Sequence, residues 1–209
     1  MTTVYLLRHS ESFRELEGIY NTKDSILLIN EKNPLSVNGE KLAEKVASNS
    51  EFNNIDIVWS SNYVRAMSTA KYFAVNNGLK VNIDYRLGER IQGITSWDQL
   101  PPGFELKQFE DETYKIGFGE NQLDVRKRME EVFDEILAAN KDKRIVIVSH
   151  ATAILFLLMK WCKVERVDDQ FKISLNDKEM FSIEHFKFCE TFKLTFDENN
   201  LVDIENISY

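Results

Sequence analysis

Cysteine is scarce in this 209-residue sequence, which contains only Cys162 and Cys189. The two residues form no CxxC pair and no spacing typical of a disulfide framework, so we expect a reduced, cytoplasmic protein. Long hydrophobic runs are also missing. The longest, around Ala153–Met159, is far shorter than the roughly 20 residues that a membrane-spanning helix needs, and we expect no membrane partner.

The sequence also lacks an excess of basic residues. It has 26 Lys and Arg against 34 Asp and Glu, which gives a formal net charge of −8. Non-specific nucleic-acid binding depends on a basic face, so we expect no nucleic-acid partner. A small anionic substrate is compatible with this charge, because a pocket can be locally basic on an acidic protein.

Several well-known catalytic motifs are absent. There is no G-x-S-x-G nucleophile elbow, no GxxxxGK[ST] phosphate loop, and no HExxH, HxH or cysteine-cluster metal motif. A cysteine phosphatase needs an arginine after five intervening residues, but Cys162 is followed by Arg166 four positions later, and the residue six positions after Cys189 is Thr195. We therefore expect neither a metal ion nor a cofactor.

Short runs rich in Val and Ile alternate with segments of helical periodicity. The runs lack strict polar–apolar alternation, as is typical of strands buried on both faces of a parallel sheet. The expected strands are Val4–Leu7, Ile55–Trp59, Leu79–Ile83 and Arg144–Val148. The expected helices begin at Ser36, at a cap formed by Asn62 or Ser61, at Leu123 (ending at Ala139) and at Ala151 (ending at Cys162).

The C-terminal third has a different pattern. Phe181–Phe188 and Thr191–Phe196 are predicted strands joined by a short turn, and Leu201–Ile207 follows them. With the alternating elements before them, they predict a three-layer α/β/α sandwich with a mostly parallel central sheet and antiparallel edge strands. We expect one domain over residues 1–209, with lid-like insertions around 11–34 and 92–120. The C-terminal strands could pair across a homodimer.

Chemically useful side chains follow several of the predicted strands. Arg8 and His9 follow the first, Arg65 lies one turn into the helix after the second, Glu89 follows the third, and His150 follows the fourth. The carboxyl ends of parallel strands meet at one edge of a sheet, where ligands bind. Taken singly, each residue is more simply explained as structural or exposed, so the functional interpretation depends on all five together. The third histidine, His185, is interpreted as structural.

This set of groups is suited to phosphoryl transfer. Two guanidinium groups can hold a phosphoryl group, and a second imidazole can donate to the same oxygens. One imidazole can attack phosphorus, and a carboxylic acid can protonate the leaving alcohol and then activate water. A small phosphorylated compound is the expected partner. Four more basic residues, Arg14, Lys23, Arg86 and Arg90, are better explained as surface residues.

Six segments of the chain resemble motifs of the histidine phosphatase superfamily, which includes the cofactor-dependent phosphoglycerate mutases. Their order and spacing also match. They are residues 6–12 (LLRHSES, similar to LxRHGET), 34–39 (PLSVNG), 60–70 (SSNYVRAMSTA, similar to SSxxxRAxxTA), 87–89 (LGE), 119–121 (GEN, similar to GES) and 146–150 (VIVSH).

The resemblance implies a role for each matching residue. His9 becomes the nucleophile that carries a covalent phosphoryl group, and Glu89 becomes the proton donor. Arg8, Arg65, His150, the N–H of Ala151, and Ser10 become the phosphate-binding residues. In the acid phosphatase branch an Asp follows the second histidine; Ala151 stands there in this sequence, which indicates the smaller branch of the family.

Two positions depart from the family pattern. Ser10 replaces the usual Gly after the nucleophile, and Glu15 replaces a common Asn. They motivate one alternative, a catalytically degenerate phosphate-binding or scaffold protein. A phosphoglycerate mutase-type phosphotransferase is a second alternative. Mutases of this family tend to be longer, with an added segment over the pocket, so we predict a metal-independent phosphomonoester hydrolase.

Overall fold

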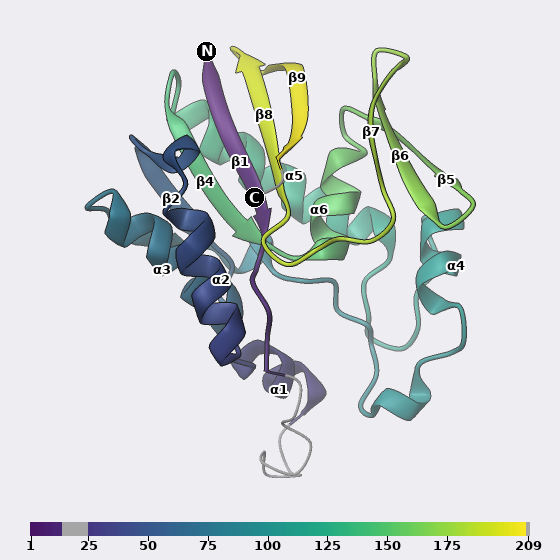
Figure 1. The fold of residues 1–209 in the computed structure, drawn as a ribbon. Helices are drawn as coiled ribbons and strands as arrows, with labels where there is room; N and C mark the ends of the chain where they lie inside the picture. Colours follow the sequence, from purple (N-terminus) through teal and green to yellow (C-terminus); the bar gives the residue numbers. More distant parts are fainter. Residues whose placement is uncertain (14–24, 208–209) are drawn as a thin grey trace.

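A computed structural model describes residues 1–13 and 25–207 of the chain. Within them, a six-stranded sheet has the order β3-β2-β4-β1-β8-β9 (Figure 1). Its strands are β1 (Thr2–Arg8), β2 (Ile57–Ser60), β3 (Val81–Ile83), β4 (Arg144–Ser149), β8 (Thr191–Asp197) and β9 (Asn200–Ile207). The first four are mutually parallel, whereas β8 and β9 are antiparallel to their neighbours. The predicted mixed sheet with antiparallel edge strands is confirmed.

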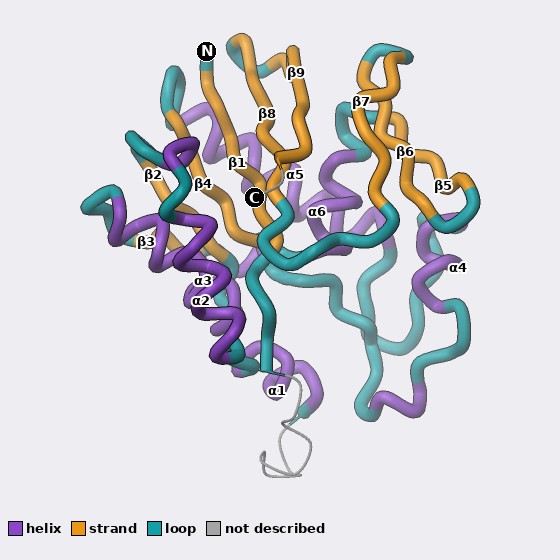
Figure 2. Tube along the Cα trace, in the orientation of Figure 1, coloured by secondary structure: helices purple, strands orange, loops and turns teal. Residues whose placement is uncertain are grey.

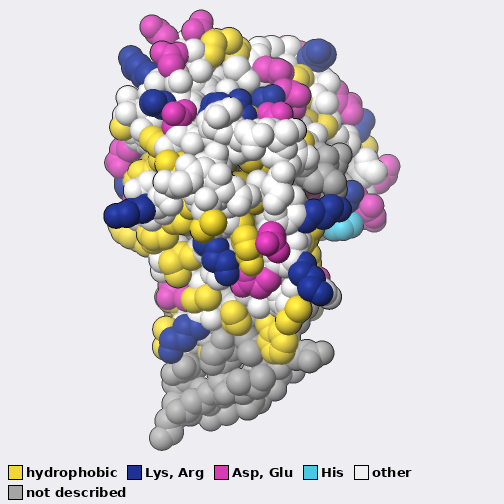
Figure 3. Space-filling view, turned by 60° about the vertical axis from the view of Figure 1, so that its left-hand side comes forward, with side chains coloured by type: hydrophobic (Ala, Val, Ile, Leu, Met, Phe, Trp, Pro, Cys, Tyr) yellow, Lys and Arg dark blue, Asp and Glu magenta, His cyan; other side chains and the backbone are white. Residues whose placement is uncertain are grey.

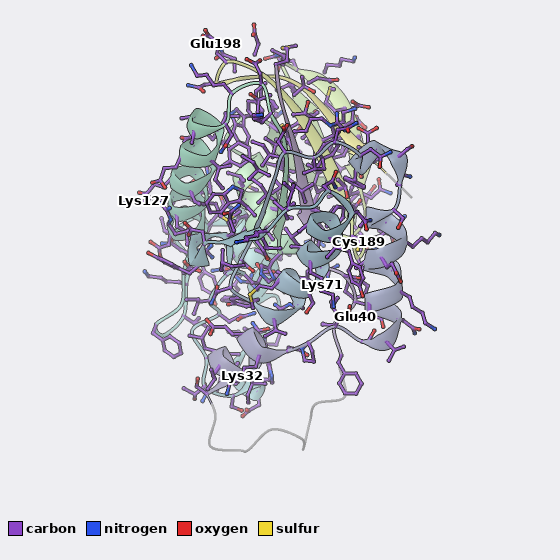
Figure 4. All side chains as sticks on the ribbon, turned by 90° about the vertical axis from the view of Figure 1, so that its left-hand side faces the viewer. Lys32, Glu40, Lys71, Lys127, Cys189 and Glu198 are labelled. Atoms are coloured by element: carbon purple, nitrogen blue, oxygen red, sulfur yellow. The ribbon has the colours of Figure 1, made fainter. Side chains whose placement is uncertain are left out.

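Helices cover both faces of this sheet. α2 (Val37–Ala47) and α3 (Val64–Asn76) lie on one face, and α5 (Gln122–Ala139) and α6 (Ala151–Leu158) lie on the other (Figure 1). Figure 4 shows Glu40 of α2 beside Lys71 of α3, an ion pair of 3.0 Å, with Lys127 of α5 on the opposite side of the molecule. The predicted three-layer α/β/α arrangement is therefore confirmed.

Alternate residues of the central strands supply two separate cores. Val4 and Leu6 of β1 pack toward α5 and α6. Tyr5 and Leu7, which point to the other face, pack toward α2 and α3. Burial on both faces explains why the central strands read as continuous apolar runs in the sequence.

A second, three-stranded antiparallel sheet was not predicted. It consists of β5 (Lys163–Val167), β6 (Gln170–Leu175) and β7 (Lys178–Ile183), and it stands beside α6 (Figure 2), with Phe181 of β7 stacked on Phe192 of β8 in the central sheet. The expected strand Phe181–Phe188 is therefore wrong in its extent and its pairing, because β7 ends at Ile183 and pairs with β6. Most side chains of β5 are exposed, so this strand lacks the apolar run that marks the central strands.

The segment 92–120 contains one helix, α4 (Phe104–Glu110), and lies below the second sheet in Figure 1. The backbone of this segment folds back closely on itself, so that its beginning and its end lie side by side. Gly93 has a φ of +83°, and a Cβ there would lie 2.1 Å from the Ile116 carbonyl oxygen. Only glycine fits that position without moving the backbone. The remaining helices are α1 (Ile26–Lys32) and single 3-10 turns at Ser50–Phe52, Tyr85–Leu87 and Trp97–Gln99.

Figure 3 shows one face of the surface, on which charged side chains of both signs occur. Lys and Arg side chains are interspersed with Asp and Glu there, and hydrophobic side chains gather in the lower half. Among the described residues, no helix is long and apolar enough to cross a bilayer.

Candidate active site

The predicted side chains at the ends of β1 and β4 lie together. The backbone N–H of His9 donates to the Ser149 carbonyl at 3.0 Å, which continues the β1–β4 pairing one residue past the strand. The imidazoles of His9 and His150 consequently approach edge to face, with ring centroids 5.1 Å apart. Two histidines that are 141 positions apart in the sequence are thus placed by one pair of parallel strands.

Arg65 joins the two imidazoles. Its Nε donates to His9 Nε2 at 3.0 Å, and its Nη2 lies 3.3 Å from His150 Nδ1. Its Nη1 donates to the Asn30 carbonyl at 2.5 Å, so α1 also contacts this guanidinium. Arg65 is only 5% exposed. Together these three side chains form a compact cluster, which we call the cup.

The hydrogen bonds of His9 fix which ring nitrogen carries the proton. Nδ1 lies 2.7 Å from the Ser10 carbonyl oxygen, which can only accept, so Nδ1 is the protonated nitrogen of a neutral ring. The lone pair is then on Nε2, on the side of Arg65. Burial, followed by the charge of Arg65, lowers the pKa of His9 well below its usual value. The ring is therefore held in the neutral form that a nucleophile requires.

His150 is fully buried and is held by neighbours from the β2–α3 connection. Its Nε2 lies 2.8 Å from Ser61 Oγ, and the Tyr63 ring packs edge to face against it at 4.6 Å. Burial, followed by the charges of Arg65 and His9, lowers the pKa of His150 well below its usual value. The expected helix cap at Asn62 or Ser61 is wrong. The N-cap residue of α3 is Tyr63, whose side chain makes no capping hydrogen bond, and the Ser61 hydroxyl contacts His150 instead.

Glu89 contacts the first turn of α6, the helix that follows His150. Its carboxylate accepts from the backbone N–H of Arg90 at 2.9 Å and of Ala153 at 3.1 Å. The charge of Glu89 acts on Arg65, which places it in the electrostatic environment of the cup. It also contributes, after burial, to raising the pKa of Tyr63 to about 12.

Arg128 of α5 fixes the loop that carries Glu89. Its guanidinium donates to the carbonyls of Arg86, Gly88 and Glu89, at 2.7, 2.8 and 3.1 Å. It also forms a two-point ion pair with Glu120, at 2.6 and 2.9 Å. This arrangement explains the GEN segment near residue 120: its glutamate orients the arginine that holds the Glu89 loop.

Arg8 and Ala151 lie at the boundary between the cup and a large cavity. Both line a cavity of about 820 Å³ that extends toward α4 and the second sheet. Arg8 donates to the Phe186 carbonyl, and its guanidinium lies 4.5 Å from the centre of the Phe188 ring. Its charge contributes to lowering the pKa of His9, after burial and Arg65.

Ser10 does not face the cup as expected for a substrate-binding residue. Its hydroxyl donates to the Gly39 carbonyl at 2.7 Å, and its backbone N–H donates to Thr69 Oγ1 at 2.9 Å. Both donors are therefore used inside the protein, and only its carbonyl serves the site, by accepting from His9. The hydroxyl that departs from the family pattern is accommodated by α2, where a Cβ on Gly39 would collide with the Glu11 carbonyl at 2.0 Å.

Four residues of the site were missed as functional candidates. Ser61, Tyr63 and Thr69 were part of a recognised motif, but their roles depend on contacts with distant strands. Arg128 had no motif of its own; its only signal is its position two turns after Glu120.

The further basic residues have mixed locations. Arg86 forms ion pairs with Asp84 and Glu135. Arg90 is only 3% exposed and donates to Gln108 of α4, so its assignment to the surface was wrong. His185 is exposed and lines the large cavity. Arg14, Glu15 and Lys23 lie outside the described residues. No group of three or more His, Cys, Asp or Glu is arranged to hold a metal ion in the parts of the chain that the structure covers.

Comparison with curated proteins finds relatives along most of the chain. A probable phosphoglycerate mutase GpmB from Serratia proteamaculans is 30% identical over 193 residues, covering 81% of this chain and 86% of that protein. The corresponding protein from Escherichia fergusonii is 27% identical over 197 residues, with the same coverage.

Solved structures share the fold at lower identity. A mycobacterial glucosyl-3-phosphoglycerate phosphatase with inorganic phosphate has a TM-score of 0.68 at 20% identity, covering 99% of this chain and 96% of that one. A phosphoserine phosphatase from Entamoeba histolytica in complex with 3-phosphoglyceric acid has a TM-score of 0.67 at 20% identity, covering 98% and 97%.

The sequence profile of the histidine phosphatase superfamily (branch 1) matches residues 4–189. The motifs, the sheet order and the profile thus agree, and the chain belongs to the histidine phosphatase superfamily.

Proposed function

We propose that this chain is a metal-independent phosphatase that hydrolyses a phosphomonoester through a covalent phosphohistidine on His9. The observation that carries the proposal is the cup. It combines a neutral imidazole with a defined lone pair, a second imidazole, and a guanidinium from the first turn of α3 that contacts both rings. Arg8 and the N-terminus of α6 at Ala151 complete the set of positive groups around the expected phosphoryl position.

The first step forms the phosphohistidine. The phosphoryl oxygens replace His9 as the hydrogen-bond partner of Arg65, which frees Nε2. The Nε2 lone pair then attacks phosphorus, the bond from phosphorus to the ester oxygen breaks, and Glu89 gives a proton to the departing alcohol. Arg8, Arg65 and His150 stabilise the charge on the equatorial oxygens.

The second step regenerates the enzyme. A water molecule gives its proton to the Glu89 carboxylate and attacks phosphorus, and the bond between phosphorus and Nε2 breaks. Inorganic phosphate leaves, and His9 returns to its neutral form with Nδ1 still donating to the Ser10 carbonyl. The hydrogen bond from the Ala153 N–H to the Glu89 carboxylate, in the helix turn that follows His150, supports the use of this carboxylate in both half-reactions.

Turnover of 4-nitrophenyl phosphate in the presence of a chelator tests the proposal. We expect His9→Ala to lower kcat by at least about 10³-fold, because it removes the nucleophile. A radiolabelled phosphoryl group should be trapped on the wild-type protein in an acid-labile, alkali-stable form, and not on the variant. Lys127→Ala, on the exposed side of α5, serves as the control. Phosphate binding without turnover would instead support a degenerate scaffold.

A mutase activity is the second candidate, because the similar curated proteins are named probable phosphoglycerate mutases. Both activities begin with the same phosphohistidine and differ in whether water or a second hydroxyl receives the phosphoryl group. Incubation with 3-phosphoglycerate and 2,3-bisphosphoglycerate distinguishes them. Rapid interconversion of the monophosphates without net phosphate release would favour the mutase. A cytoplasmic location, the absence of a cofactor and a homodimer stay predictions from the sequence.

A further inference from the structure

The cavity next to the cup has two walls that are separate in sequence. One is formed by α4 and the residues before it, and the other by the second sheet and the segment that follows β7. Phe109 of α4 and Phe171 of β6 meet across the gap, with ring centroids 5.2 Å apart. The cavity volume of about 820 Å³ is in the range of sites that bind small organic molecules.

Aromatic side chains form much of the inner lining. Phe104 and Phe186 are buried, whereas Phe109 and Phe171 are half-buried and present part of their rings to the cavity. A smaller cavity of about 120 Å³ adjoins it and is lined in part by Leu155 and Phe156 of α6. A flat, carbon-rich group placed here would exchange water contacts for ring contacts.

The charged groups around this lining are mainly acidic. Arg8 belongs to the phosphate end, and beyond it the only Arg or Lys lining the cavity in the described residues is Arg166. Arg166 forms an ion pair with Asp169 at 3.2 Å, so much of its charge is already balanced. Three carboxylates line the same cavity: Glu105, which lies 3.6 Å from the buried guanidinium of Arg90, Asp169, which is the partner of Arg166, and Glu184.

This balance disfavours a second anionic group on the substrate. A carboxylate or second phosphate that entered beyond Arg8 would meet carboxylates with one partly neutralised guanidinium among them. Glu105 and Asp169 are 78% and 91% exposed, so solvent weakens their repulsion of an anion; what chiefly disfavours a second anion is that the described residues lining the cavity beyond Arg8 supply no uncompensated guanidinium or ammonium group. Among the described residues that line the cavity, the second charge of a phosphoglycerate or a bisphosphate would therefore find no uncompensated Arg or Lys beyond Arg8.

We propose that the cavity binds the leaving group of a phosphomonoester whose alcohol is aromatic or similarly carbon-rich and carries no further negative charge. The inference depends on the phosphatase function proposed above and gives that function its substrate class. The second sheet is then a specificity element, and Phe171 is its main contact with the substrate.

Three alkyl phosphates of similar leaving-group chemistry test the proposal: ethyl phosphate, 2-phenylethyl phosphate and 2-(4-carboxyphenyl)ethyl phosphate. We expect kcat/KM for the phenylethyl ester to exceed that for the ethyl ester by about tenfold or more, because ring burial adds binding energy. Adding the carboxylate should reduce kcat/KM by about tenfold, mainly through KM.

Variants assign both preferences to this cavity. Phe171→Leu, and more strongly Phe171→Ala, should reduce the ratio of phenylethyl to ethyl turnover. Joint replacement of Asp169→Asn and Glu184→Gln should reduce the discrimination against the carboxylated ester. Lys178→Ala, an exposed position on the same sheet outside the cavity lining, should leave both ratios unchanged.

The outcomes separate this inference from the phosphatase proposal. Hydrolysis that depends on His9 but has equal kcat/KM for 2-phenylethyl phosphate and its carboxylated analogue would overturn the inference and leave the phosphatase proposal intact. If no ester is hydrolysed, the phosphatase proposal fails. Affinities of the His9→Ala variant for the three esters, measured by calorimetry, then still test the proposed substrate class. Tighter binding of the phenylethyl ester than of the other two supports that class, and equal or weaker binding overturns it.

Discussion

The cup and the cavity wall lie side by side but differ in how they are built. Two residues of the cup, His9 and His150, directly follow the buried parallel strands β1 and β4, and Arg65 lies in the first turn of α3, where its side chain contacts both imidazoles. The cavity wall is made by α4 and by a small sheet whose strand β5 is largely exposed. In the function proposed above, the reaction chemistry belongs to segments that continue the central sheet, and the substrate contacts belong to peripheral elements outside that sheet.

Removing the guanidinium of the cup should have the largest effect among the variants that probe this comparison. Arg65→Ala should lower kcat/KM by about 10²–10³-fold, because a buried donor to the transferring phosphoryl group is lost. Arg65→Lys should recover only part of the loss, since a single ammonium cannot reach both imidazoles. Arg166→Ala in the cavity wall should cost less than about tenfold. Steady-state kinetics with 2-phenylethyl phosphate measures all three, and equal losses at Arg65 and Arg166 would contradict the division between cup and wall.

Replacement of the proton donor should depend on the leaving group. Glu89→Gln should reduce kcat by about 10²-fold for 2-phenylethyl phosphate, whose alkoxide needs a proton. The loss should be much smaller for 4-nitrophenyl phosphate, whose phenolate leaves unprotonated. Glu105→Gln, a carboxylate of the cavity wall, should affect both esters alike. A Glu89→Gln loss that is independent of the leaving group would exclude the acid role.

Arg128 lies outside the cup and tests whether a residue that only positions the Glu89 loop affects catalysis. As a positioning residue it should act through Glu89, so Arg128→Ala should lower kcat by about tenfold with the same dependence on the leaving group. Leaving the Glu120 carboxylate without its partner should also lower the free energy of unfolding, by about 1–3 kcal/mol. Arg126→Ala, which breaks only the Glu130 pair one turn away, is the control. A change in stability without the leaving-group dependence would indicate a purely structural role.

The pH dependence of stability probes the two imidazoles of the cup without any substrate. His9 and His150 have lowered pKa values, chiefly because they are buried and then because Arg65 is close. The unfolded chain therefore binds protons below its histidine pKa of about 6.5 that the folded chain does not, and stability present above that pH is lost as the pH falls. The slope between about pH 6.5 and 5.5 should approach 1.4 kcal/mol per histidine per pH unit.

Denaturant unfolding at several pH values measures this slope. His9→Gln should remove the share of one histidine. An unchanged slope would mean that the imidazole titrates normally in the folded protein.

The sequence alone determined the layered fold and the identity of the cup. Strands buried on both faces leave continuous apolar runs, and the residues that follow such runs converge on one sheet edge whatever their separation along the chain. The positions of His9, Arg65, Glu89 and His150 relative to these runs therefore predict that they lie close together.

Only the tertiary structure decided the rest. The hydroxyl of Ser10 donates to the Gly39 carbonyl, Arg65 donates to Nε2 of His9, and Arg128 donates to the carbonyls of the Glu89 loop. The second sheet contacts α4 through Phe171, although its strand β5 is largely exposed and leaves little hydrophobic pattern in the sequence. These features depend on side-chain contacts between distant segments, which periodicity and motif spacing do not encode.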